Sequence, residues 1–211
     1  MSFGTVITAD IVNSTILPKP AFNKLRKVIE SLLESHKFEF YRGDSFQVYL
    51  KENEKALGLM LKLRLAAKRV TTDSKSEIDV RAGIGIGRVN SPIRVLKTST
   101  EEPFVLSGRS LDSLNSVTVL NERLIIISFD ENANCVFRTV GRFIDYIFKD
   151  ITAKQAAVIF EILMGHTQTD IAKKLKKSQV TINKQVHAAG WTEIERLLMD
   201  YENAINQFNL K

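Results

Sequence analysis

Residues 178–187 carry amide, hydroxyl and amine side chains at the outward positions of a short amphipathic pattern. Amides pair with adenine edges, a lysine pairs with guanine or phosphate, and a threonine methyl group contacts thymine. The pattern therefore predicts a surface that reads the major groove of double-stranded DNA. The predicted contact residues are Ser178, Gln179, Thr181, Asn183, Lys184 and His187.

A cluster of lysines precedes these residues. Residues 151–191 contain six lysines and two acidic residues, an excess of four positive charges, whereas the whole chain has a net charge of +6. Lys173, Lys174, Lys176 and Lys177 would meet phosphates beside the groove, which sets affinity rather than sequence preference. Taken alone, such a cluster also suits a solvated helix face.

Three short helices are predicted to position these side chains, over residues 151–165, 167–175 and 179–189. Ala172 is small enough to let the last two helices cross steeply. A helical hairpin that only packs on another domain is the alternative. The lysine pair at 176–177 stands where a tight turn usually has glycine. Because a lysine at positive φ costs on the order of 1 kcal/mol, we expect a turn one residue longer than usual.

This segment of about forty residues resembles the helix-turn-helix of LuxR-type regulators and of sigma-factor region 4. The resemblance implies an all-α helix-turn-helix domain over residues 150–211 whose partner is double-stranded DNA. A palindromic site needs a two-fold protein, and two amphipathic patterns, at 129–148 and 191–208, offer apolar stripes for pairing. We therefore expect a homodimer.

Three motifs in the N-terminal part resemble the catalytic domain of class III nucleotidyl cyclases: A-D-I-V-N-S-T (9–15), R-G-D-S-F-Q-V (42–48) and V-R-A-G-I-G-I-G (80–87). The resemblance implies that Asp10 and Asp44 hold Mg²⁺ or another divalent cation, with a nucleotide as a further ligand. The end of a central strand and the tip of the next hairpin would bring the two carboxylates to one hard cation.

Other cyclase positions differ. Phe40 stands where the family has its base-selecting residue, and residues 107–112 lack the paired Asn and Arg, although Arg109 lies among them. Without a group that stabilises the transferring phosphate, we expect a sensing site and no cyclase activity. Two alternatives stay open. Asp10 and Asp44 can be turn and cap residues, or the chain can be a metal-dependent enzyme on nucleotides that its helix-turn-helix localises.

The cyclase-like motifs together with S-G-R-S-L-D (107–112) and the C-terminal helices resemble the SatD family of bacterial proteins over nearly the whole chain. This resemblance implies a regulatory or DNA-binding role and no settled reaction.

The alternation of apolar patterns predicts an α+β fold, in which a ferredoxin-like antiparallel sheet with helices on one face precedes the helical domain. The order is β-α-β-β-α-β, followed by a helix and a strand. Glycines at every second position of 80–87 indicate close approach of a backbone or a ligand. We expect the sheet domain over residues 1–128 and a connecting helix over 129–149, opened by a capping box of Ser128 and Glu131.

Composition excludes several classes of protein. No apolar run is long enough to span a membrane, and Cys135 is the single cysteine, so we expect no disulfide and no structural metal site. The sequence pattern indicates a cytoplasmic protein without a secretory signal.

Overall fold

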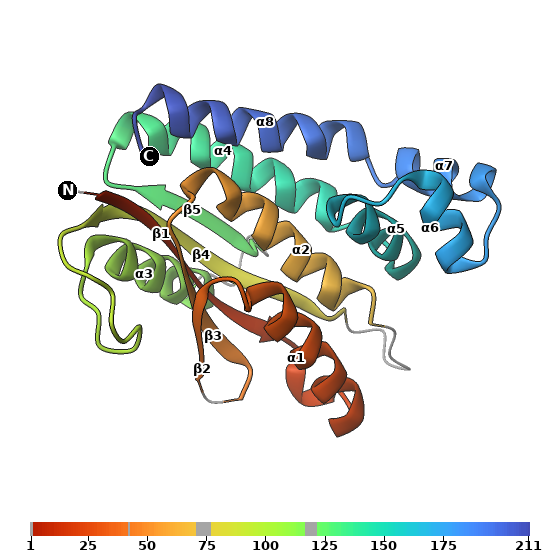
Figure 1. Cartoon of the computed structure of the whole chain (residues 1–211), viewed down its shortest axis with the longest axis horizontal. Coiled ribbons are helices and arrows are strands. Elements are labelled where there is room, and N and C mark those ends of the chain that lie inside the picture. Colours follow the sequence, from red (N-terminus) through yellow and green to blue (C-terminus); the bar gives the residue numbers. More distant parts are fainter. Residues whose placement is uncertain (1, 42, 71–76, 117–121) are drawn as a thin grey trace.

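The computed structural model describes residues 2–41, 43–70, 77–116 and 122–211, and Arg42 of the predicted hairpin turn lies outside them. The N-terminal unit is a sheet with helices on both faces (Figure 1). Its elements are β1 (Ser2–Val12), η1 (Ser14–Ile16), α1 (Lys19–Leu33), β2 (Lys37–Tyr41), β3 (Ser45–Leu50), η2 (Asn53–Lys55), α2 (Ala56–Lys68), β4 (Asp79–Val89), α3 (Glu102–Ser116) and β5 (Leu124–Ser128).

The strands have the order β2-β3-β1-β4-β5, and β1 is antiparallel to both of its neighbours. This is the predicted β-α-β-β-α-β arrangement, and the α+β class is confirmed. The sheet is not wholly antiparallel as predicted, because β5 joins β4 in parallel. The crossover helix α3 makes this pairing geometrically accessible, since parallel neighbours need a long connection.

The prediction that the helices share one face is wrong. Helices α1 and α2 cover one face, and α3 covers the other (Figure 1). The β4 glycines explain the second layer. A Cβ on Gly83 or Gly85 would lie 2.3 Å from a backbone oxygen of α3, so only glycine lets the two backbones approach this closely. The close approach expected at residues 80–87 is thus made by a helix backbone.

Helix α4 (Glu131–Phe148) begins at a different cap from the one predicted. Asp130 is the N-cap, and its carboxylate accepts hydrogen bonds from the backbone N–H groups of Asn132 (2.8 Å) and Ala133 (3.1 Å). Ser128 belongs to β5, and its hydroxyl donates to the Asp130 carbonyl at 3.0 Å. The strand includes Ser128 itself, and the cap lies two residues later, at Asp130.

Helix α8 (Trp191–Gln207) returns along α4 toward the sheet unit (Figure 1). Tyr201 stacks at a tilt on Phe137 with ring centroids 5.5 Å apart, and its hydroxyl donates to the Asn53 carbonyl at 2.9 Å. The buried side-chain amide of Asn53 donates to the Leu210 backbone carbonyl and accepts a hydrogen bond from the Thr5 hydroxyl. These contacts tie the last helix to the first strand.

The apolar stripes of α4 and α8 are therefore used within one chain. Their buried side chains belong to a single core that also contains residues of α1, α2 and α5 (Ala153–Leu163). This packing buries most of the apolar surface from which we predicted a homodimer, although Phe143 of α4 and Met199 of α8 stay 44% and 55% exposed. The homodimer stays a prediction. The core is continuous across the boundaries expected after residues 128 and 149, and the three-part domain division stays a prediction. None of the helices in the described ranges is both long and apolar enough to cross a membrane.

Candidate functional site

Two short helices, α6 (Gln168–Leu175) and α7 (Gln179–Ala188), lie with α5 at one end of the molecule (Figure 1). Thr167 caps α6 by accepting a hydrogen bond from the Asp170 backbone at 3.2 Å. Ser178 caps α7 by accepting one from the Thr181 backbone at 3.1 Å. Each helix therefore begins where its hydroxyl residue satisfies free backbone donors.

Three residues separate α6 from α7, within the usual length of about three to four residues for such a turn. Our expectation of a longer turn is wrong, because Lys176 adopts the left-handed conformation with φ 52°. Its N–H donates to the Lys173 carbonyl, and the N–H of Lys177 donates to that of Ala172 at 3.0 Å. These bonds satisfy the last carbonyls of α6 and offset the strain at Lys176.

Helix α7 buries a narrow apolar face and exposes the rest. Ile182 and Val186 are 1% and 5% exposed, and they pack against Ile171 and Ala172 of α6. Every predicted contact residue from Ser178 to His187 is exposed. Ala172 is buried in this cluster, which is consistent with the need for a small side chain there.

The lysine cluster divides into two kinds of side chain. Lys174 pairs with Glu161 at 2.7 Å, so its expected role at phosphates is not supported. Among the described residues, Lys173, Lys176, Lys177 and Lys184 are exposed and have no acidic partner within ion-pair distance. The free positive charge therefore lies around the turn and on α7.

The sequence pattern did not indicate a role for Gln168. Gln168 begins α6, is half-buried, and accepts a hydrogen bond from the Asn183 amide at 3.5 Å. The contact is long for a hydrogen bond, and it links α6 to the α7 side chain that we expect to read a base. The sequence could not indicate this contact, because Gln168 and Asn183 are fifteen positions apart.

The two cyclase-like aspartates have neighbouring backbones but different side-chain partners. The Ile11 N–H donates to the Asp44 carbonyl at 3.2 Å, which brings the strand end and the hairpin together. The Asp10 carboxylate accepts from Arg81 Nε (3.2 Å) and Nη2 (2.8 Å), whereas the Asp44 carboxylate accepts from the Ser14 hydroxyl (2.6 Å). Asp44 lines a cavity of about 320 Å³ that does not include Asp10.

Two further positions were compared with the cyclase family, and the structure places one of them in a packed aromatic cluster and the other at the surface. Phe40 packs against Phe46, and the Arg26 guanidinium covers its ring at 4.5 Å. Arg109 is exposed on α3. In the described ranges no three His, Cys, Asp or Glu side chains come together, so a cation would have only the two aspartates.

A cation at Asp10 and Asp44 must compete with Arg81, since the guanidinium holds both Asp10 oxygens. We expect millimolar Mg²⁺ or Mn²⁺ to raise the melting temperature more in Arg81→Gln than in the native protein, because that variant frees the carboxylate. Adding Asp44→Asn should abolish the rise. If neither the native protein nor Arg81→Gln responds, Asp10 and Asp44 serve only to hold the strand end and the hairpin turn together.

No family model matches the chain, and no curated protein matches it. Among solved structures, it is similar to the active GGEEF domain of a diguanylate cyclase from Vibrio cholerae. That similarity has a TM-score of 0.43 and 15% identity over 62% of this chain and 85% of that chain. Such a likeness assigns neither a family nor an activity. Membership of the SatD family stays a prediction.

Proposed function

We propose that this protein is a cytoplasmic DNA-binding transcriptional regulator that uses α6 and α7 as a helix-turn-helix, with α7 in the major groove. The observation that carries the proposal is the row of exposed polar side chains on α7 together with Lys173, Lys176, Lys177 and Lys184, which have no acidic partner in the part of the chain that the structure describes. A hairpin that served only to pack would place mostly apolar residues there, whereas Ile182 and Val186 of α7 face α6 and Val180 is the one large apolar residue of α7 that is exposed, at 65%.

The positions of these residues decide which would contact bases and which would contact phosphates. Gln179, Thr181 and Asn183 lie in the first half of α7, the part of a recognition helix that meets base edges. Lys173, Lys176 and Lys177 lie at the end of α6 and in the turn, where phosphates pass beside the groove. The sheet unit would sense a ligand or pair protomers. The alternative of a metal-dependent enzyme is not favoured, because Asp10 already pairs with Arg81.

The proposal is tested by titrating a fluorescent DNA duplex with the full-length protein at several salt concentrations. Four lysine–phosphate contacts predict a slope of about −3.6 for log K against log salt, or roughly a hundredfold loss of affinity between 50 and 200 mM. Affinity that does not change with salt, or absence of binding at low salt, would contradict the proposal.

A further inference from the structure

A buried lysine, Lys68, ends α2 beside the start of β4. The Lys68 side chain is 1% exposed. Its ammonium contacts the Glu77 carboxylate and lies 3.8 Å from Asp79, yet it makes no hydrogen bond to any described residue. A buried ammonium has three donors to satisfy, and among the described residues the Glu77 carboxylate is the single acceptor in contact with this one.

The nearest buried carboxylates are already occupied. Arg64 donates to Asp79 through Nε (3.1 Å) and Nη2 (2.8 Å), and to Asp145 of α4 through Nη1 (2.6 Å). The other Asp145 oxygen accepts from the backbone N–H groups of Arg123 (2.8 Å) and Leu124 (3.1 Å). Lys68 therefore shares its surroundings with an ion network that has little acceptor capacity left.

A cavity of about 180 Å³ opens beside the Lys68 ammonium. Four cationic and three acidic side chains line it. Arg64 is paired with Asp79 and Asp145, so the remaining cations are Lys68, Arg123 and Lys149. Burial lowers the pKa of Lys68 to about 8; Asp79 and Asp145 oppose this shift, and the charges of Arg64 and Arg123 add to it. The side chains that line this open cavity thus carry an excess of one positive charge.

We propose that this cavity binds a small oxyanion of the phosphate class, held by Lys68, Arg123 and Lys149 in place of the Glu77 carboxylate. A guanidinium fork and ammonium groups are the donors that suit such an anion. Glu77 is the acid of the set that gives way, because its side chain is 49% exposed while Asp79 is 3% exposed. The bound ion would fasten α4 to the sheet unit.

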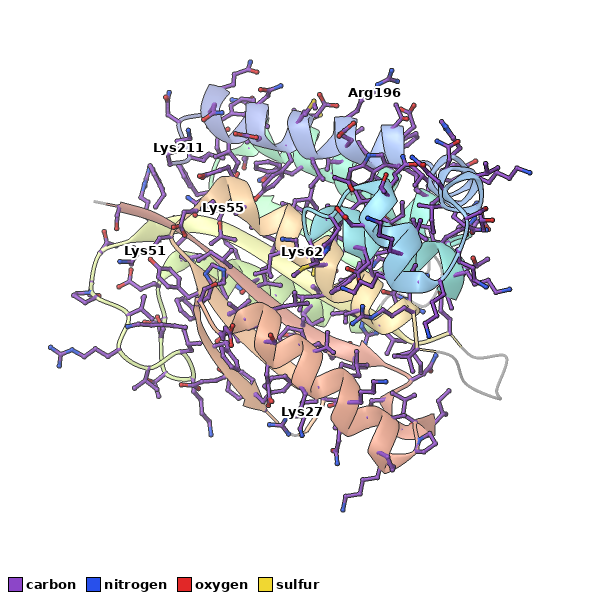
Figure 2. The ribbon with its side chains drawn as sticks, turned by 45° about the vertical axis from the view of Figure 1, so that its right-hand side comes forward. Lys27, Lys51, Lys55, Lys62, Arg196 and Lys211 are labelled. Carbon is purple, nitrogen blue, oxygen red and sulfur yellow. The ribbon has the colours of Figure 1, made fainter. Side chains whose placement is uncertain are left out.

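The proposal is tested by thermal unfolding of the full-length protein at neutral pH with millimolar inorganic phosphate, at constant ionic strength set with chloride. We expect a rise in melting temperature of about 3–5 °C when phosphate exceeds its Kd tenfold. Lys68→Met should lose this rise, and Glu77→Gln should bind phosphate several-fold more tightly because the competing carboxylate is gone. Lys62→Met, on the same helix but outside the cavity (Figure 2), should respond as the native protein does.

One further variant and two further ligands complete the experiment. Lys149→Ala removes an exposed cation and should weaken phosphate binding without affecting folding, which guards against an unfolded Lys68→Met. Sulfate keeps its charge between about pH 6 and 9, so its effect should fall as Lys68 loses its proton near pH 8. A larger rise in melting temperature with adenosine monophosphate than with phosphate would identify the ligand as a phosphomonoester, and a smaller rise would identify it as free phosphate. A native protein that responds to phosphate no more than to chloride, or a Lys68→Met variant that responds fully, would overturn the proposal.

Discussion

Replacing Arg64 with methionine is expected to lower the free energy of unfolding by about 3–5 kcal/mol. Arg64 is the largest fully buried side chain, and its guanidinium is the main partner of Asp79 and Asp145, whose side chains are 3% and 12% exposed. Without Arg64 the Asp145 carboxylate loses its ion-pair partner and Asp79 keeps only Lys68, 3.8 Å away. Phe148 also loses the guanidinium 4.6 Å from the centre of its ring. Urea unfolding measures the change, with an unaltered slope showing that the same surface is exposed.

The chain offers a matched control for this variant. Arg26 forms a helical ion pair with Glu30 at 2.9 Å, and both side chains are 38% exposed. The same substitution there should cost less than about 1 kcal/mol, because solvent already screens the pair. Equal effects of Arg64→Met and Arg26→Met would show that the buried network does not hold α4 against α2 and β4.

The combined variant Lys173→Ala, Lys176→Ala, Lys177→Ala is expected to lower affinity for a DNA duplex about a hundredfold at low salt. Three of the four unpaired lysines near α7 are removed, so the slope of log K against log salt should become shallower by about three units. Folding should be unaffected, because all three side chains are exposed. Anisotropy titrations across salt concentrations give both quantities.

Two controls locate the effect. Lys27, Lys51 and Lys55 are exposed and lie at the bottom and left of Figure 2, apart from α6 and α7 at the right, and changing all three to alanine removes the same charge. That variant should bind nearly as the native protein does. Lys174→Ala should also have little effect, because Lys174 is engaged with Glu161. Equal losses in the two triple variants would show that net charge, and not the α6–α7 surface, attracts DNA.

Local features of the fold were predictable from the sequence. The helix caps at Thr152, Thr167 and Ser178 each depend on residues within three positions of one another, so the local sequence is enough to locate them. The burial of α2 around most of its circumference also follows its composition, because the sheet lies on one side and α5 and α8 lie on the other.

Long-range features were not predictable. Which face α3 covers depends on the handedness of a crossover and on glycines that accept a helix backbone, and a glycine pattern alone does not tell a helix from a ligand. Lys174 and Glu161 are thirteen residues apart on different helices, so their pairing left no local pattern. For the same reason the Arg81 partner of Asp10, seventy-one positions away, changed the site expected from the cyclase resemblance.

Sequence-selective binding by α7 is tested most directly by selecting duplexes from a randomised library with the full-length protein. The native protein should enrich one motif. Asn183→Ala should still bind but lose preference at one base pair, by about 1–3 kcal/mol, because an amide that pairs with adenine is gone. Asn203→Ala, exposed on α8, should enrich the native motif unchanged. No enriched motif with the native protein, or an identical preference in Asn183→Ala, would contradict base reading by α7.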